Sequence, residues 1–405
     1  MKTICHPNAH RLCASVTENY IAERLLDSCL GTFARSSMGQ NVVALVLTGS
    51  FSRGEGSIFI DSSGVAHVLG DIEFFVVLND EANHKVAMTQ LSDLSSSVEQ
   101  ELEEQQIDCK VEFSPVARSY FRRVRPRIFN YELLKHGKVA LGDKSILQEI
   151  PSFGAESIPP EDGFYLFSNR MVEQLIAWKS LENNSCDNRY QILKLYLDMA
   201  GSCLVVSGRY APTYSERVGL CAEVVAAKNI IIAADRRQSF LEILKAATEY
   251  KLNPNTTECP LMSGPYSPKM FWKQFKEAAA FCKEIWLWEI QYLFGASDKN
   301  DSWTVSANHR FPVRFVVREW LKFLLMAHRA GQEYSVWRAI RMIAKGTPRT
   351  MIYAAAANLY FSLAEGQKVD LGAIEQLLPI PCRLDSEEQA LDAVIAAWNN
   401  FVRSA

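Results

Sequence analysis

Two apolar runs separated by a polar turn, between residues 42 and 78, constrain the fold more than any other part of the sequence. The first run, Val42–Leu47, is rich in β-branched residues and predicts a buried strand. Gly49 and Ser50 follow it, and such small residues let backbone N–H groups approach an anion closely. The second run, Phe74–Leu78, predicts another strand. The sequence therefore predicts a sheet in which a polar turn follows a buried strand.

Two acidic residues, Asp71 and Glu73, directly precede the second apolar run. On a strand they point to the same face, because side chains repeat every two residues. Two carboxylates side by side at the edge of an apolar strand repel each other and are costly to desolvate. A divalent cation compensates for this, because hard cations prefer oxygen ligands. The pair therefore predicts a metal site.

The Gly49-Ser50 pair, a spacer, and acid–hydrophobic–acid on the next strand resemble the nucleotidyltransferase fold of the DNA-polymerase-β-like superfamily. That superfamily includes aminoglycoside nucleotidyltransferases, poly(A) and CCA-adding enzymes, and cyclic-dinucleotide-type synthases. Arg53-Gly54 strengthens the resemblance, because members often carry Arg-Gly after the Gly-Ser pair. The resemblance covers residues 40–115 and implies an α+β fold. We expect a mixed sheet with flanking helices, followed by a large all-helical C-terminal region.

Members of the superfamily add a third carboxylate from a later strand, and Glu112 fits that place. It belongs to a predicted strand that Pro115 should end, and its apolar neighbours belong on the opposite face. Asp108 shares the face of Glu112 but lies about 13 Å away along a strand. Only one of the two can complete the group, and we choose Glu112.

The spacer is where this chain departs from the family pattern. Asp71 follows Ser50 by 21 positions, which is longer than usual in the family. A predicted hairpin within residues 57–68 accounts for the excess. Gly70 also stands where the family often has Ser. Neither difference removes a ligand, but both change the surroundings of the predicted site.

The resemblance implies that Asp71, Glu73 and Glu112 hold two Mg²⁺ ions, with Mn²⁺ as an alternative. It also implies that Gly49, Ser50 and Arg53 lie on the nucleotide side of the site.

Members commonly place a lysine on a helix of the following domain, where it reaches the triphosphate. Lys194, one helical turn after Tyr190, is our candidate, with Lys179 as a rival. The alternative, an ordinary exposed lysine, is about as compatible with the pattern. The segment from Gly208 to Arg217 also resembles bacterial members of the superfamily, which would place Ser215 and Arg217 toward the substrate.

Apolar spacing predicts helices over most of the remaining chain. These are 15–35 with Thr17 as cap, 81–106, 164–182, 188–207, 235–257, 267–295, and four or five more after Arg314. The aromatic stripe of 267–295 predicts core packing, and Ala354–Ala357 predict close helix contacts. The arginines of 118–127 would either bind phosphate or pair with the acidic end of 81–106, whose charges otherwise face solvent.

Breaks in composition predict three domains. Residues 143–160 are rich in Pro, Gly and Ser, and residues 298–312 are polar without apolar periodicity. We therefore expect a catalytic domain at 1–150, a helical domain that closes the nucleotide site at 151–297, and a C-terminal helical domain at 298–405.

Composition limits the kinds of partner and the cellular compartment that we expect for this protein. A net charge of −3 argues against a long nucleic acid as partner. Ten cysteines without a CxxC pair indicate buried, reduced thiols and a cytoplasmic protein. No run approaches the ~18 apolar residues of a membrane span, and the start lacks a signal-peptide core, so no membrane partner is expected.

The predicted activity is transfer of a nucleoside monophosphate from an NTP, with ATP as our choice, to a hydroxyl acceptor. The acceptor would be a small molecule, a sugar or a protein. A nucleotide second-messenger synthase and a catalytically silent nucleotide-binding scaffold remain as alternatives. The C-terminal helices would recognise the acceptor, form a homo-oligomer or dock a partner.

Overall fold

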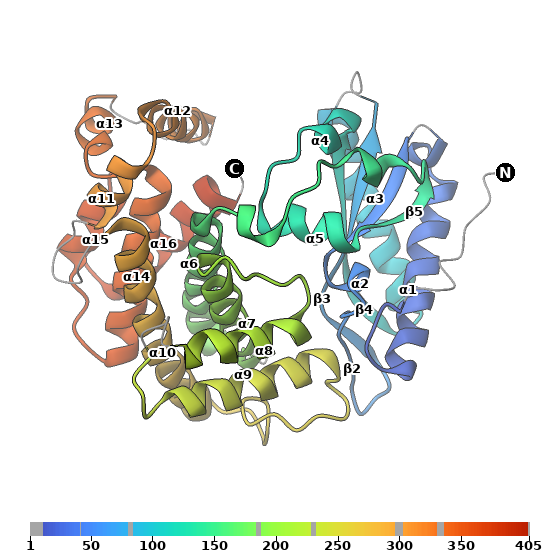
Figure 1. Cartoon of the computed structure of the whole chain (residues 1–405), viewed down its shortest axis with the longest axis horizontal. Helices are drawn as coiled ribbons and strands as arrows, with labels where there is room; N and C mark the ends of the chain where they lie inside the picture. The colour runs from blue at the N-terminus through green and yellow to red at the C-terminus, as the bar shows by residue number, and fades with distance from the viewer. Residues whose placement is uncertain are drawn as a thin grey trace. The chain divides into compact units, whose positions relative to one another are not determined.

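The computed structural model describes residues 11–40, 42–79, 84–183, 188–227, 232–295, 303–329 and 336–403. The chain is α+β and forms two compact units (Figure 1). Unit 1 takes residues 1–159, 208–220 and 245–260, and unit 2 takes 160–207, 221–244 and 261–405. The first passage between the units, after Pro159, lies in the segment where sequence predicts a boundary. The boundary predicted at 297/298 lies outside the described residues.

A five-stranded mixed sheet forms the centre of unit 1. Its strands are β1 (Ala44–Thr48), β2 (Ile58–Ile60), β3 (Ala66–Leu78), β4 (Ile107–Ala117) and β5 (Lys138–Gly142). The long strand β3 pairs antiparallel with β2 and β1, and parallel with β4. Strand β5 pairs antiparallel with β1. The predicted hairpin is confirmed, but its second strand and the strand of Asp71 and Glu73 are one continuous strand.

The β3–β4 pair has two features that the sequence did not predict. Pro115 does not end β4, which continues to Ala117. β4 pairs only with β3 among the described strands, and an edge strand tolerates proline because one side needs no N–H donor. The register also shifts, since His67 pairs with Asp108 whereas Asp71 pairs with Lys110. β3 therefore has two residues more than β4 in this interval, which indicates a bulge.

The two faces of the sheet carry different cores, as the two-residue period requires. One face, with Leu47, Phe74 and Val111, packs against α1 (Val16–Arg35) and α3 (His84–Glu104). The other face, with Val46 and Val77, packs against α4 (Arg118–Arg122) and α5 (Ile128–His136). Short elements complete this part of unit 1: α2 (Gly49–Ser52) and the 3₁₀ helices η1 (Met38–Gln40), η2 (Ile146–Glu149) and η3 (Ala155–Ser157).

The N-cap of helix α1 lies two residues before the predicted cap, Thr17. The Ser15 hydroxyl accepts a hydrogen bond from the Glu18 N–H at 3.2 Å, so Ser15 is the N-cap. Thr17 lies inside the first turn, and its assignment as cap was wrong.

Two later segments, residues 208–220 and 245–260, complete unit 1, whereas the sequence predicted that unit 1 ends at residue 150. Helices α8 (Tyr214–Ala226) and α9 (Arg237–Leu252) each contribute residues to both units. Asn255 follows α9 and binds the edge strand β2, donating to the Ile58 carbonyl at 2.8 Å and accepting from the Ile60 N–H at 2.8 Å. Its amide also donates to buried Glu18. Asn255 thereby satisfies strand groups that would otherwise lack partners.

Unit 2 is helical in the described residues. It contains α6 (Pro160–Lys179), α7 (Arg189–Val206), α10 (Pro268–Phe294), α11 (Trp303–Arg310), α12 (Val313–Arg329), α13 (Val336–Ile343), α14 (Pro348–Glu365), α15 (Leu371–Leu377) and α16 (Glu387–Trp398), with short helices η4 (Ser180–Asn183) and η5 (Asn399–Arg403). The helices predicted from apolar spacing are confirmed. The polar stretch 298–312 instead contains α11 in its described part.

The predicted core of unit 2 is confirmed. The aromatic side chains of α10 pack inward, with Trp286 stacked on Phe164 at 4.7 Å between ring centroids. Ala354–Ala357 of α14 are all buried, so neighbouring helices approach closely there. Among the described residues, no helix is both long and apolar enough to cross a membrane.

Candidate metal centre

Three carboxylates meet at the point where β3 and β4 run side by side. Asp71, Glu73 and Glu112 each offer one oxygen, and these oxygens lie within 4.8 Å of one another. Glu73 pairs directly with Glu112 in the β3–β4 register, so the parallel ladder itself brings the second and third acids together. Asp71 and Glu112 are exposed and Glu73 is half-buried. The structure thus groups the three residues that sequence selected.

The turn after β1 leaves room for this group. Thr48 of β1 pairs with Glu73 of β3, so the turn begins beside the acids. Gly49 has φ +67°, a left-handed conformation that favours glycine. A β-carbon at Gly49 would overlap Glu73 Oε2 and come within 3.2 Å of its carboxyl carbon. The absence of a side chain at residue 49 therefore allows Glu73 to take its position.

The surroundings of Glu73 disfavour its ionised form. Burial, together with the nearby charges of Asp71 and Glu112, raises the pKa of Glu73 to about 7. Arg53 acts in the opposite direction but does not cancel these effects. A hard divalent cation would relieve this strain, because it supplies positive charge and prefers carboxylate oxygens. The donor set therefore fits Mg²⁺ or Mn²⁺.

The two rival acids of β4 have different partners. Ser114 donates its hydroxyl to Glu112 Oε1 at 2.8 Å and so orients that carboxylate. Asp108 instead lies 2.9 Å from Nδ1 of His67, whose Nε2 lies 3.0 Å from Asp61. The hydrogen bond to Asp61 and, to a lesser extent, the hydrogen bond to Asp108 raise the pKa of His67. Asp108 thus belongs to a separate His–carboxylate group, and Ser114 is a supporting residue that sequence reasoning missed.

Arg53 is buried in an ion-pair network. Its side chain is only 6% exposed, and it binds Glu132 at 2.6 Å and Glu55 at 3.4 Å. Glu132 also accepts from Arg217 at 2.5 Å and from the Tyr210 hydroxyl at 2.6 Å. Burial alone would raise the pKa of Glu132, but Arg53 and Arg217 hold it below its usual value. The predicted nucleotide contact is thus engaged with protein carboxylates, and its field acts on Glu73.

Glu55 connects this network to the later segment of unit 1. Its carboxylate accepts from the Tyr214 N–H at 2.8 Å and the Ser215 N–H at 3.3 Å, and so caps α8. Arg217 is buried and donates to the carbonyls of Ala211 and Pro212. Its guanidinium is therefore committed to the protein. No spacing in the sequence marks Glu55 or Glu132, because their partners lie far along the chain.

The remaining predicted nucleotide residues lie in two places. Ser50 is half-buried in α2, and its carbonyl accepts from the Arg53 and Glu55 N–H groups. Tyr190 and Lys194 lie on α7 of unit 2, with the Lys194 ammonium 5.1 Å from the centre of the Tyr190 ring. The rival Lys179 binds Asp392. The role of Lys194 toward a triphosphate stays a prediction.

The arginine-rich segment pairs with acids, but not with those expected. Arg118 binds Asp143 at 3.2 Å and Glu149 at 2.5 Å, and Arg122 binds Glu149. These partners follow β5, whereas pairing with the acidic end of α3 was predicted. That end of α3 is also not simply solvated, because Glu101 binds Thr32 and Arg35.

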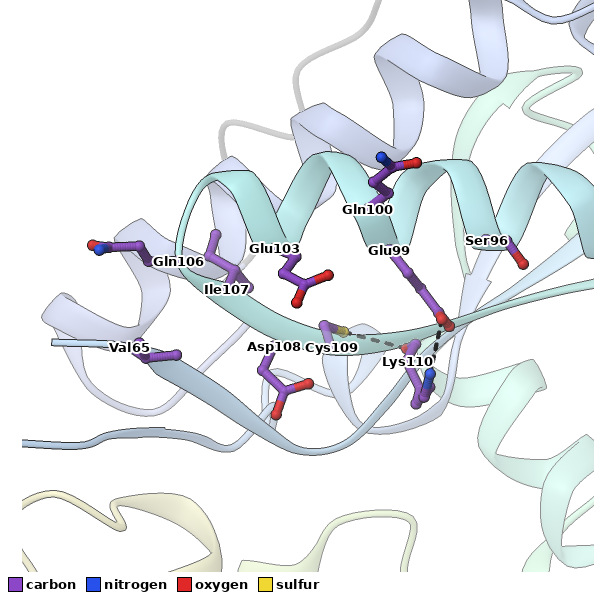
Figure 2. Close-up of a pocket in the computed structure, with 10 residues that line it drawn as sticks. All are labelled: Val65, Ser96, Glu99, Gln100, Glu103, Gln106, Ile107, Asp108, Cys109 and Lys110. Atoms are coloured by element: carbon purple, nitrogen blue, oxygen red, sulfur yellow. Dashed lines mark hydrogen bonds and ion pairs between the residues drawn. The ribbon is translucent and has the colours of Figure 1, made fainter. Parts of the chain in front are cut away.

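A polar groove of about 670 Å³ lies apart from the three carboxylates, between α3 and the first half of β4. In Figure 2, Glu99 reaches from α3 toward Lys110, to which it binds at 2.9 Å, while Glu103 lines the same side. Glu99 also accepts from the Val111 N–H, and Asp108 is held by His67. Glu99 and Lys110 therefore bind each other, and Asp108 binds His67, which does not line the groove.

Comparison with protein-family models, with curated proteins and with solved structures finds no match for this chain.

Proposed function

We propose that this protein is a metal-dependent nucleotidyltransferase, with the nucleotidyltransferase fold in unit 1. It would transfer a nucleoside monophosphate from ATP to a hydroxyl of a small-molecule, sugar or protein acceptor, and release pyrophosphate. The observation that carries the proposal is the meeting of Asp71, Glu73 and Glu112 within 4.8 Å, beside a turn at Gly49 that makes room for Glu73. Three converging carboxylates destabilise an apo protein, so a metal ligand set gives them a physical reason to be there.

The residues would divide the work as follows. Asp71, Glu73 and Glu112 would supply the oxygen ligands. Bound Mg²⁺ would polarise the phosphate oxygens and lower the pKa of the acceptor hydroxyl. The Gly49 N–H and the Ser50 hydroxyl would bind the β- and γ-phosphates.

In the transfer step, one bond forms at the α-phosphorus, one bond breaks there, and a protein carboxylate accepts the proton. A bond forms between the acceptor oxygen and the α-phosphorus, and the bond to the leaving pyrophosphate breaks. The acceptor proton would pass to Glu112, which Ser114 orients. Arg53 would act through Glu73 and the network of Glu132, since its own guanidinium is engaged.

The proposal also includes a location for the activity, the cytoplasm. Eight cysteines lie in the described part of the chain without a disulfide, and all but Cys382 are buried. Buried thiols fit a reducing environment, and we place the activity in the cytoplasm.

The test compares each NTP in a thermal-shift assay with Mg²⁺, followed by measurement of pyrophosphate release. Asp71→Asn and Glu112→Gln should lose both responses while keeping the circular dichroism spectrum of the wild type. Asp108→Asn, which removes the rival charge on the same face of β4, is the matched control and should keep both. Nucleotide binding without pyrophosphate release under any acceptor condition would instead support a silent scaffold. Labelled ATP in cell extract would then identify the acceptor, including a second nucleotide.

A further inference from the structure

Exposed apolar side chains are concentrated on two helices of unit 2. Among the described residues, six of the eleven exposed large hydrophobic side chains lie on α12 and α13: Val313, Val317, Leu321, Leu325, Trp337 and Ile340. Trp337 alone is 73% exposed. Figure 1 shows both helices at one end of unit 2. Such a concentration marks an interaction site, whereas scattered exposed apolar residues need no explanation.

Helix α12 has two adjacent apolar faces, of which only one is covered. Val316, Trp320 and Phe323 are buried, and the Trp320 indole N–H donates to the Gly346 carbonyl at 3.0 Å. The exposed residues Val313, Val317, Leu321 and Leu325 recur every four positions, so they form one continuous stripe beside the buried face. The helix is therefore fixed to unit 2 and still presents an apolar stripe outward.

A basic row borders this stripe. Arg314, Arg318 and Lys322 are exposed and also recur every four positions, each directly after an exposed apolar residue. Arg341 adds an exposed positive charge on α13. The acid of α12, Glu319, is half-buried and lies on the other side of the basic row. The outward side of α12 is thus apolar and positively charged.

We propose that α12 and α13 dock on an anionic lipid surface. Their exposed apolar and basic residues, which we call the α12–α13 face, fit such a surface in both chemistry and charge: Val313, Arg314, Val317, Arg318, Leu321, Lys322, Leu325, Trp337, Ile340 and Arg341. An apolar stripe with a basic border and a tryptophan is the pattern of a helix that lies in the membrane interface. The lipid headgroups would neutralise Arg314, Arg318 and Lys322 while the stripe enters the acyl boundary. A second copy of the chain fits less well, because an antiparallel pair of α12 helices would bring two basic rows together, and like charges across an interface repel each other.

This proposal departs from the expectation of no membrane partner. That expectation considered spanning segments and signal peptides, and neither bears on a helix that lies flat on a surface. It is also independent of the proposed transferase activity, since no residue of the α12–α13 face belongs to the metal centre.

The test is flotation of the full-length protein with vesicles of phosphatidylcholine, with and without phosphatidylglycerol. The wild type should bind only the anionic vesicles, and added salt should weaken the binding. The double variant L321Q/L325Q should partition on the order of 100-fold more weakly, because two apolar side chains are lost from the stripe. R314Q/R318Q should partition at least about tenfold more weakly.

The matched control is V86Q/M88Q, which replaces two exposed apolar residues of α3 in unit 1. It should bind like the wild type. Circular dichroism would establish that all variants are folded, which is expected because the replaced side chains are exposed. Failure of the wild type to float with anionic vesicles would overturn the proposal. A dimer in light scattering that L321Q/L325Q converts to monomer, without vesicle binding, would assign the face to a second copy.

Discussion

Gly49 lies against the carboxylate of Glu73, so that a β-carbon at position 49 would overlap Glu73 Oε2. Gly49→Ala should therefore displace Glu73 and also strain a backbone that has φ +67°. We expect loss of the Mg²⁺-dependent thermal shift and a fall in activity on the order of 100-fold. Stability should fall by about 1 kcal/mol from the backbone strain. Thermal-shift and pyrophosphate-release assays would measure both.

Gly64→Ala separates these two causes. Gly64 has φ +87°, but a β-carbon there would meet nothing within 4 Å. The control should lose similar stability and keep the Mg²⁺ response. Equal effects of both variants on the Mg²⁺ response would refute the steric role of Gly49.

The raised pKa of Glu73 makes stability depend on pH. Between the ordinary value of 4.5 and the folded value of about 7, the folded state holds more protons than the unfolded state. Stability of the metal-free protein should therefore fall as pH rises through this interval, by on the order of 2 kcal/mol. Urea unfolding with a chelator at pH 5 and pH 8 would measure this. Glu73→Gln should flatten the profile, and an unchanged profile would contradict the assignment.

Protons and metal should compete at the same carboxylates. Because Glu73 is more fully ionised above pH 7, the Mg²⁺-induced rise in melting temperature should be larger at pH 8 than at pH 6. A thermal-shift series with Mg²⁺ and with Mn²⁺ would check this. A response that is independent of pH would argue that the cation binds elsewhere.

Removal of the Glu132 charge should destabilise unit 1 strongly. Glu132→Gln leaves Arg53 and Arg217, which are 6% and 5% exposed, without the carboxylate they share. Breaking a buried ion pair in this way costs about 3–5 kcal/mol. Denaturant unfolding would measure the change.

Glu149→Gln is the control for Glu132→Gln, because Glu149 binds the more exposed Arg118 and Arg122. Exposed pairs contribute little, so this variant should lose less than about 1 kcal/mol. Similar losses in the two variants would mean that the network of Glu132 is not a stabilising centre.

The pKa values of two histidines in unit 1 should be shifted in opposite directions. Hydrogen bonds to Asp61 and Asp108 raise the pKa of His67, whereas burial and the charge of Arg53 lower that of His136. The stabilisation from His67 should be fully present below pH 6.5 and disappear as pH rises through its folded value. An NMR titration should show His67 above His136, and Asp108→Asn should lower only the former.

Local patterns predicted the elements and the acid group well. The period of two placed Asp71 and Glu73 on one face, and apolar neighbours placed Glu112 opposite the core, so three residues could be selected without coordinates. Helices with strong apolar spacing, such as α7 and α10, were also predictable. These features depend on side chains a few positions apart.

The rest of the site depends on contacts that no local pattern encodes. Glu55 caps a helix 159 positions later in the chain, and Glu132 binds Arg53 and Arg217 from opposite directions in sequence. Pro115 gave a false end to β4, because its effect depends on whether the strand lies at an edge. Only tertiary structure decides such cases.

The interleaving of the two units governs when the protein can fold during synthesis. Unit 1 lacks residues 208–220 and 245–260 until more than half of the chain has been made, including residues 160–207 and 221–244 of unit 2. Glu55 and the edge of β2 must wait for Tyr214 and Asn255, respectively. At about 5–20 residues per second, that wait is on the order of ten seconds or more. A nascent chain released after residue 159 would therefore carry all three acids without the two later segments that bind Glu55 and β2.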